Sequence, residues 1–176
     1  KVLDWRDAVL FEAEHAELIS GTDREKFECP PLTFDLWTFI LNKESFQTKT
    51  VPVTHVKEWL QNFGGVHIYQ NGLRVTPYGD PGNDWLDLNL RRVRSPEERP
   101  STNNSIGRVS FNDPNSLLVQ KTDRSGFIES DAFIGIREFG QITLDWMARK
   151  RLEEAEKRRE REKKEVRQKT AESRKD

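Results

Sequence analysis

The sequence predicts an α+β fold, a mixed β-sheet with helices on one face, followed by a long charged helix. Three observations lead to this prediction. Residues 32–41 alternate and are rich in aromatic side chains, Asn71-Gly72 joins two short runs of strand formers, and helical spacing begins near Asp131. Alternation indicates a strand, Asn-Gly between such runs indicates a hairpin, and steps of three and four indicate a helix.

Composition limits the class of protein. The chain has 176 residues, of which 34% are hydrophobic and 34% charged, so it holds enough apolar material for one modest core. Cys29 is the single cysteine, which excludes an internal disulfide and predicts a reducing, cytoplasmic location. No apolar run approaches the roughly 18 residues of a membrane span, and the N-terminal residues lack the basic-then-apolar pattern of a secretory signal. Because the first residue is Lys, we expect a piece of a longer protein.

Charge is distributed unevenly. Residues 148–176 hold 13 Lys and Arg against 8 Asp and Glu, a net charge of about +5, and the preceding residues carry about −6. An acidic body argues against a general nucleic-acid binder, whereas the basic tail offers one surface for such a partner.

The N-terminal part is expected to hold a helix and a strand. Residues 3–19 place Trp5, Val9 and Ala13 on one helical face and predict a helix. Residues 32–41 follow Pro-Pro and alternate, which predicts a strand buried on both sides.

A second helix and a hairpin come next. Residues 50–63 have apolar residues at three- and four-residue steps, with Thr54 as the N-cap and Gly64-Gly65 as a left-handed stop. Residues 66–79 then form a hairpin, since Asn71-Gly72 suits the positive φ angles of a type I′ turn.

The C-terminal half combines a loop, two strands and a long helix. Residues 80–105 form a long polar connection, strands are expected at 106–111 and 117–120, and a helix begins at Ser130 or Asp131. The helix continues into the tail, which is interpreted as a solvated single helix. A coiled-coil start, disorder and nucleic-acid contact are the alternatives.

Side chains suited to chemistry are few. His15, His55 and His67 lack metal-ligand spacing, and residues 80–87 lack the full ligand pattern of a calcium loop. No phosphate-binding loop and no Gly-x-Ser-x-Gly motif occurs. A hydrolase using Asp80, Asp84 and His67 is a minor alternative.

The strongest candidate site is the loop KTDRSGF, residues 121–127. It places Lys121 and Arg124 beside Thr122 and Ser125, between a strand end and a helix start. Cations and backbone N–H groups near a helix N-terminus suit a phosphate group. The alternative is a helix-entry loop with two solvated charges.

The order of elements points to a family. A helix ending in Gly-Gly, the hairpin GGVHIYQNGLRVTPYG, a polar loop, the strand IGRVSF and LLVQKTDRSGF before a long helix follow one another. This order resembles the second, transducer domain of the GHKL ATPases, the superfamily of gyrase B, the ninety-kilodalton heat-shock chaperone, MutL and the microrchidia proteins. It is nearest to the microrchidia-like and bacterial histidine kinase-like ATPase branches. The resemblance implies a ribosomal-protein-S-five-like fold with a left-handed βαβ crossover.

The resemblance also implies a role for loop 121–127. In the family a cation of this loop, usually lysine, reaches the γ-phosphate of ATP held by the neighbouring domain. The microrchidia-like register places that cation at Arg124, and a register nearer to MutL places it at Lys121. Thr122 lies between them in the same phosphate-facing loop. An arginine would bind phosphate as a fork, whereas a lysine is a point charge.

The nucleotide pocket itself is missing from the sequence. The family's Glu-x-x-x-Asn helix, Asp-x-Gly-x-Gly turn and glycine-rich lid do not occur in residues 1–176. The resemblance therefore implies part of an ATP hydrolase that is not catalytic alone, with ATP and magnesium held mainly by an upstream GHKL domain of a homodimer.

These considerations divide the chain into a helical lead-in at 1–29, a transducer-like domain at 30–147 and a charged helix at 148–176. The resemblance further implies that Arg74 and the 80–105 loop face a partner domain or the second subunit, with a solvated Arg74 as the alternative. A module of another class remains open. It is a non-enzymatic protein-interaction or nucleic-acid-binding module that uses Arg91, Arg92, Arg94 and the tail.

Overall fold

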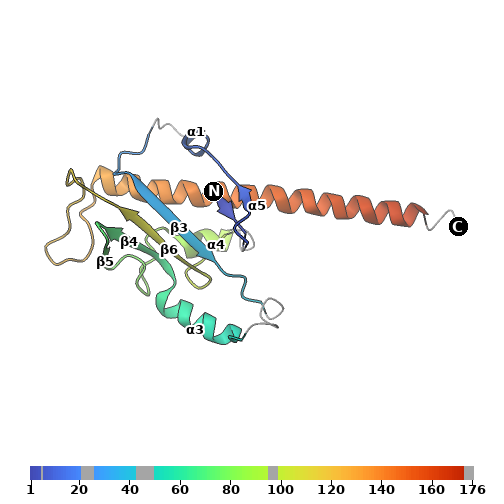
Figure 1. Cartoon of the computed structure of the whole chain (residues 1–176), viewed down its shortest axis with the longest axis horizontal. Helices are drawn as coiled ribbons and strands as arrows, with labels where there is room; N and C mark the ends of the chain where they lie inside the picture. The colour runs from blue at the N-terminus through green and yellow to red at the C-terminus, as the bar shows by residue number, and fades with distance from the viewer. Residues whose placement is uncertain (5, 21–25, 43–49, 95–98, 173–176) are drawn as a thin grey trace.

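The computed structural model describes residues 1–4, 6–20, 26–42, 50–94 and 99–172. Its centre is a four-stranded sheet in the order β3-β6-β4-β5, shown in Figure 1. The strands are β3 (Leu32–Thr38), β4 (Gly65–Gln70), β5 (Leu73–Val75) and β6 (Ser105–Phe111). The sheet is mixed, because β6 pairs antiparallel with β3 and parallel with β4. The predicted α+β class with a mixed sheet and a long C-terminal helix is confirmed.

β3 forms where alternation predicted a strand, but its burial differs from the prediction. Its register with β6 joins Leu32 to Phe111 and Trp37 to Ile106. Leu32, Phe34 and Leu36 pack against the core, whereas Trp37 on the opposite face is 52% exposed. The expectation that this strand is buried on both sides is therefore wrong, because no described layer covers the Trp37 face.

The core lies on the other face of the sheet, under α5 (Asp131–Glu172). Figure 1 shows this helix passing behind the start of β3. Ile136 of α5 and Ile68 and Val109 of the two central strands are fully buried. Because these side chains come from elements far apart in the sequence, their burial ties the helix to the sheet.

The β4–β5 hairpin forms as the turn chemistry predicted. Asn71 and Gly72 have φ angles of 52° and 80°, the positive pair of a type I′ turn. Register pairs Tyr69 with Arg74 and Ile68 with Val75. The turn therefore fixes which side chains of β5 face the core.

The helix before the hairpin, α3 (Val53–Phe63), forms within the predicted 50–63 stretch and begins before the predicted cap. Its N-cap is Pro52 with no side-chain cap, so the prediction of Thr54 is wrong; proline suits a helix start, where its missing N–H costs nothing. Gly64 at the C-cap has a φ of −70°, and the left-handed angle falls on Gly65, with a φ of 102°. Leu60 is its buried residue.

The N-terminal segment corrects the predicted helix over 3–19. It contains β1 (Val2–Leu3), β2 (Val9–Phe11) and a short α1 (His15–Ile19). The Asp4 carboxylate accepts the backbone N–H groups of Arg6 and Ala8, at 2.8 and 3.0 Å, and Asp7 has a φ of 62°. This side-chain-stabilised turn competes with helix formation, and a two-stranded ribbon results.

Two further expectations are corrected between β5 and α5. The 80–105 connection is not a plain loop, because it contains α4 (Leu88–Arg94), where the Asp84 carboxylate accepts N–H groups of Leu88 and Asn89. The strand expected at 117–120 is reduced to one bridge between Gln120 and Phe127. The Asp113 carboxylate takes the N–H groups of Leu117 and Leu118, which removes them from any ladder.

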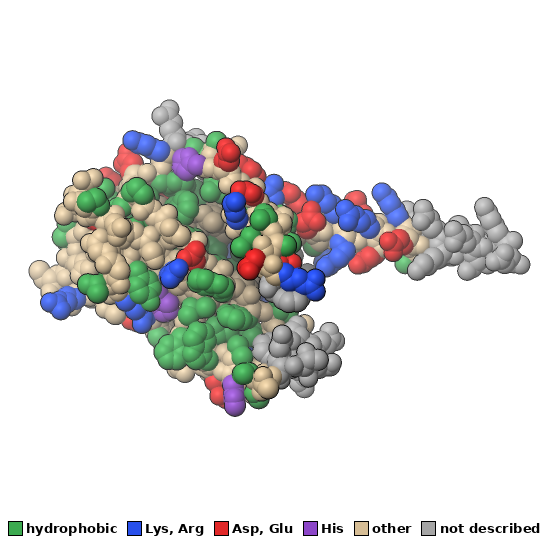
Figure 2. Space-filling view, viewed as in Figure 1, with side chains coloured by type: hydrophobic (Ala, Val, Ile, Leu, Met, Phe, Trp, Pro, Cys, Tyr) green, Lys and Arg blue, Asp and Glu red, His purple; other side chains and the backbone are tan. Residues whose placement is uncertain are grey.

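The long helix begins where it was predicted. The Ser130 hydroxyl accepts the Phe133 N–H at 3.3 Å, and the helix then runs 42 residues. Figure 2 shows Lys, Arg, Asp and Glu side chains around its protruding end and hydrophobic side chains gathered over the body. The prediction that the tail is helical is confirmed for the described residues.

Candidate functional site

Loop 121–127 joins the end of the sheet region to α5. Three backbone hydrogen bonds close it: Lys121 N–H to the Gly126 carbonyl, Arg124 N–H to the Lys121 carbonyl and Ile128 N–H to the Val119 carbonyl. The first and the last of these form the bridge that pairs Gln120 with Phe127. Within the loop, the amides of Lys121 and Arg124 are thus already engaged by backbone carbonyls. The loop is a small closed ribbon, so any anion would meet its side chains before its backbone.

An acidic residue lies between the two cations of the loop. The Asp123 carboxylate accepts the Ser125 hydroxyl at 2.7 Å and the Ser125 N–H at 2.9 Å. These hydrogen bonds, with the nearby charge of Lys121, hold the pKa of Asp123 below its usual range. Asp123 therefore stays ionised near neutral pH and leaves the loop with a net charge of +1.

Arg124 occupies the turn of the loop in a left-handed conformation, with a φ of 58°. A non-glycine residue there costs roughly 1 kcal/mol through crowding of its Cβ. Its side chain and that of Thr122 are exposed. Arg124 is thus an exposed cation at the turn of the loop.

Lys121 lies elsewhere, at the rim of a hollow of about 420 Å³. Aromatic and polar side chains from three segments line the hollow. Those contributed by the 77–85 segment are Pro77, Tyr78, Gly82, Asn83, Asp84 and Trp85. Ser125, Glu129 and Arg137 line it as well, but Thr122 and Arg124 do not. The structure thus separates the two candidate cations.

Arg137 is a residue of this hollow that sequence reasoning missed. It pairs with Glu129 at 2.6 Å, and its guanidinium lies 5.0 Å from the ring centroid of Phe133. The stacking and the ion pair keep the charge at the edge of the hollow. Its spacing from Phe133, four residues along one helix face, was the available signal.

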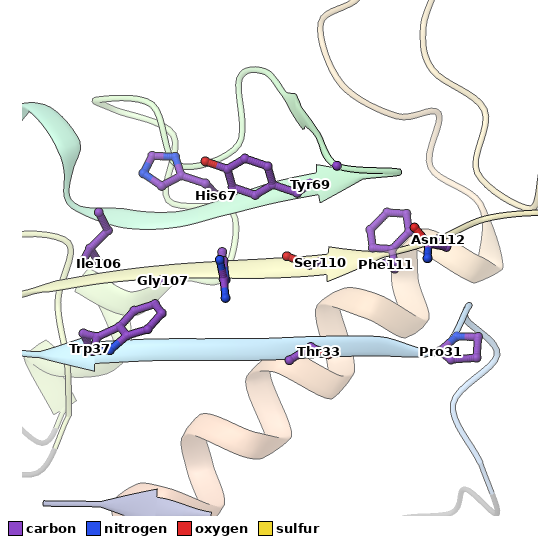
Figure 3. Close-up of a pocket in the computed structure, with 12 residues that line it drawn as sticks. Pro31, Thr33, Trp37, His67, Tyr69, Ile106, Gly107, Ser110, Phe111 and Asn112 are labelled. Carbon is purple, nitrogen blue, oxygen red and sulfur yellow. The ribbon is translucent and has the colours of Figure 1, made fainter. Parts of the chain in front are cut away.

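A second hollow, of about 660 Å³, lies on the open face of the sheet. Figure 3 shows Trp37, Thr33, Ser110 and Tyr69 standing on this face. Arg108 of β6 contacts two side chains of the adjacent strand β3. Its Nε donates to the Asp35 carboxylate at 2.9 Å, and its guanidinium lies 5.8 Å from the centroid of the Trp37 ring. The face is thus aromatic and, at its centre, electrically balanced.

His67 connects this face to Arg74. Its Nε2 lies 3.1 Å from the Phe63 carbonyl oxygen, and its Nδ1 lies 2.9 Å from the Arg74 guanidinium. A carbonyl only accepts and a guanidinium only donates, so the imidazole is assigned as the neutral Nε2–H tautomer. Arg74 also pairs with Asp80. Two internal partners, His67 and Asp80, therefore hold the partly exposed Arg74 side chain in place.

The basic stretch 91–94 is partly engaged within the protein. Arg91 and Arg99 donate to the Asp145 carboxylate, at 2.7 and 2.6 Å, and Arg92 donates to the Arg99 carbonyl at 2.8 Å. Burial alone would raise the pKa of Asp145, but the hydrogen bonds and charges of the two arginines lower it overall. These contacts tie α4 and the following segment to α5.

Neither a metal centre nor a membrane span is found in the described ranges. No three His, Cys, Asp or Glu side chains there lie close enough to hold a metal ion. No helix among them is both long and apolar enough to cross a bilayer. In the 80–87 segment, whose sequence lacks the full calcium-ligand pattern, Asp84 caps α4 and Asp80 pairs with Arg74.

Comparisons with known proteins return no similarity for this chain. No protein-family model matches it, no curated protein sequence matches it, and no solved structure matches it.

Proposed function

We propose that this chain is the transducer module of a dimeric GHKL-type ATPase. ATP bound by an upstream domain would meet Lys121 or Arg124 through its γ-phosphate, and the chain would pass on the resulting movement. The observation that carries the proposal is the position of loop 121–127. It holds two exposed cations, and α5 starts only four residues beyond it.

The contacts around the loop support a role in transmission. One end is bridged through Gln120 and Phe127, and the Phe127 ring is buried in the core beneath the sheet. The other end runs into α5, whose Phe133 and Ile136 belong to the same core. A force applied at Lys121 or Arg124 would therefore act directly on the start of a long helix.

The topology is compatible with the proposed transducer class. β4 and β6 are parallel neighbours, and the connection between them contains β5 and α4. The proposal requires this crossover to have the left-handed form of the family. An experimental structure that assigns the hand of the crossover tests this part of the proposal.

The donor set fits the phosphate end of a nucleotide. Lys121 and Arg124 would hold the terminal phosphate, and ATP would supply the bond whose cleavage drives the cycle. Because the described residues contain no carboxylate cluster, Mg²⁺ would be bound together with the nucleotide on the upstream domain. This chain's own task would be to neutralise negative charge on the phosphate.

The test uses the parent protein, in which this chain follows its nucleotide-binding domain. We expect Lys121→Ala or Arg124→Ala to lower kcat for ATP hydrolysis at least about tenfold, since losing a cation from a developing phosphate charge costs a few kcal/mol. Lys57→Ala on α3, also an exposed cation, is the matched control. Unchanged turnover in both variants would remove the proposed function.

The nucleic-acid alternative now depends mainly on the C-terminal part of α5. Arg91 and Arg92 have internal partners, whereas the basic residues of α5 beyond Ala148 lie mostly exposed. Polyanion binding through that segment would weaken steeply as salt rises. Loss of such binding on deletion of residues 149–176, with ATPase activity unaffected by Lys121→Ala and Arg124→Ala, would favour the alternative.

A further inference from the structure

Tyr78 contacts the candidate loop, a contact that the sequence analysis did not predict. It follows β5 by three residues and is 7% exposed. Its hydroxyl accepts the Phe127 N–H at 2.8 Å. Residues 49 positions apart are thus joined by one hydrogen bond, which ties the segment after the hairpin to the loop that precedes α5.

The same peptide group also holds Lys121. The N–H of Phe127 and the C=O of Gly126 belong to one planar peptide unit, and this C=O accepts the Lys121 N–H at 2.9 Å. Tyr78 therefore fixes one side of a rigid plane, and the backbone of Lys121 is bound to the other side. The position of the cation depends on the phenol through two consecutive hydrogen bonds.

Gly126 allows this close approach. Its φ of 99° favours glycine, and a Cβ at this position would lie 2.6 Å from the Tyr78 hydroxyl oxygen. The loop backbone thus rests directly on the phenol. Burial raises the pKa of Tyr78, so the phenol is neutral near neutral pH, and a lone pair of its oxygen accepts the Phe127 N–H.

Tyr78 is itself held by the core. Its ring lies 5.6 Å from the Trp85 ring centroid, 5.8 Å from Phe127 and 5.2 Å from Phe133. The Trp85 indole N–H donates to the Val66 carbonyl of β4 at 2.7 Å. A continuous set of contacts therefore runs from the central strand through Trp85 and Tyr78 to the loop.

We propose that Tyr78 is a positioning residue that sets the place of Lys121 and Arg124 relative to the sheet. This inference rests on the proposed function for its consequence, but its structural part stands alone. Without the phenol oxygen, the Gly126–Phe127 peptide loses its anchor and the cations lose their fixed distance from the sheet. The cations remain present, but their phosphate contact becomes less frequent.

The test compares Tyr78→Phe with Tyr69→Phe, the same deletion of one oxygen on the open face of the sheet. Hydrogen exchange of peptides covering residues 121–128 is measured first. We expect the exchange rate there to rise about tenfold in Tyr78→Phe and to stay unchanged in Tyr69→Phe. Unchanged exchange in Tyr78→Phe would overturn the positioning role.

Activity of the parent protein separates the two proposals. We expect Tyr78→Phe to lower kcat for ATP hydrolysis about fivefold at unchanged KM for ATP, measured per folded molecule. Faster exchange with unchanged kcat would overturn the link to catalysis. If Lys121→Ala and Arg124→Ala also leave kcat for ATP hydrolysis unchanged, the proposed function fails, whereas the structural role of Tyr78 stands.

A second variant, Gly126→Ala, tests the same anchor if the Tyr78→Phe protein folds poorly. Gly126→Ala presses on the phenol from the loop side, and it leaves every core side chain unchanged. We expect the same faster exchange over residues 121–128 and the same loss of kcat. Normal exchange in a folded Gly126→Ala protein would contradict the proposed anchoring.

Discussion

Trp146 donates its indole N–H to the Glu17 carboxylate at 3.2 Å, across 129 positions of sequence. Trp146 is buried, and Lys150, one turn further along α5, approaches the same carboxylate at 3.3 Å. The short helix α1 is thereby attached to the middle of α5. Movement of the N-terminal segment would therefore be felt by α5 without passing through the sheet.

This contact predicts the titration of Glu17. The hydrogen bond from Trp146, then that from Lys150, lowers the pKa of Glu17 below its usual range. A lowered folded pKa means that its stabilising contribution is complete above the unfolded value of about 4.3 and is lost as pH falls through the folded pKa. Carboxyl-carbon NMR should give a low midpoint for Glu17, and Trp146→Phe should move it upward. A normal midpoint in the unmodified chain would contradict the contact.

The Asp145 carboxylate predicts a pH-dependent stability difference. Asp145→Asn should lower the free energy of unfolding at pH 7 by about 1–2 kcal/mol, allowing for solvent screening of a partly exposed group. Because the folded pKa is lowered, the difference should be complete above about pH 4 and disappear as pH falls through that pKa. Urea unfolding at several pH values measures it.

The matched control for Asp145 is Asp35→Asn, which breaks the more exposed pair with Arg108. A surface ion pair of this kind contributes about 0–1 kcal/mol, so we expect a smaller change. If the two variants lose the same free energy of unfolding, the contact of Asp145 with two arginines stabilises the protein no more than a surface ion pair does.

The core predicts a large effect at Ile136. This side chain of α5 is fully buried against the sheet, and truncating such a residue costs about 2–5 kcal/mol. Ile136→Ala should therefore lower the denaturant midpoint strongly. Leu73→Ala in β5, at a side chain that is 75% exposed, should change the free energy of unfolding by less than about 0.5 kcal/mol. A small effect at Ile136 would mean that α5 does not cover the sheet.

Local turn chemistry made one part of the fold predictable. Asn71-Gly72 determines its own backbone angles, so the hairpin follows from two residues and the alternation around them. The start of α5 was predictable for the same reason, because Ser130 provides a cap directly before a periodic apolar run.

Competition from side chains explains two of the wrong predictions. The apolar spacing over 3–19 predicted a helix, but the Asp4 carboxylate takes two backbone N–H groups and closes a turn. Asp113 does the same to the N–H groups of Leu117 and Leu118, where a strand was expected. Periodicity reports which face is apolar and not which partner satisfies each amide.

The candidate loop could be found from the sequence, but its support could not. Lys121 and Arg124 lie together in a short polar run, which is visible in any window of seven residues. Tyr78 reaches that run only because β4 and β5 fold back beneath it. Arg137 reaches the same hollow through its position on α5. Such contacts depend on tertiary structure, which single-sequence patterns do not encode.

Because α5 is long, a small tilt of the helix produces a larger displacement at its C-terminal end. Its last buried residue before the protruding part is Ala148, and the helix continues to Glu172. At 1.5 Å per residue this leaves an arm of about 36 Å beyond the body. Tilting the helix by about 10° would swing the far end through roughly 6 Å. A small tilt at the start of α5 would thus displace its C-terminal end by about the width of a side chain.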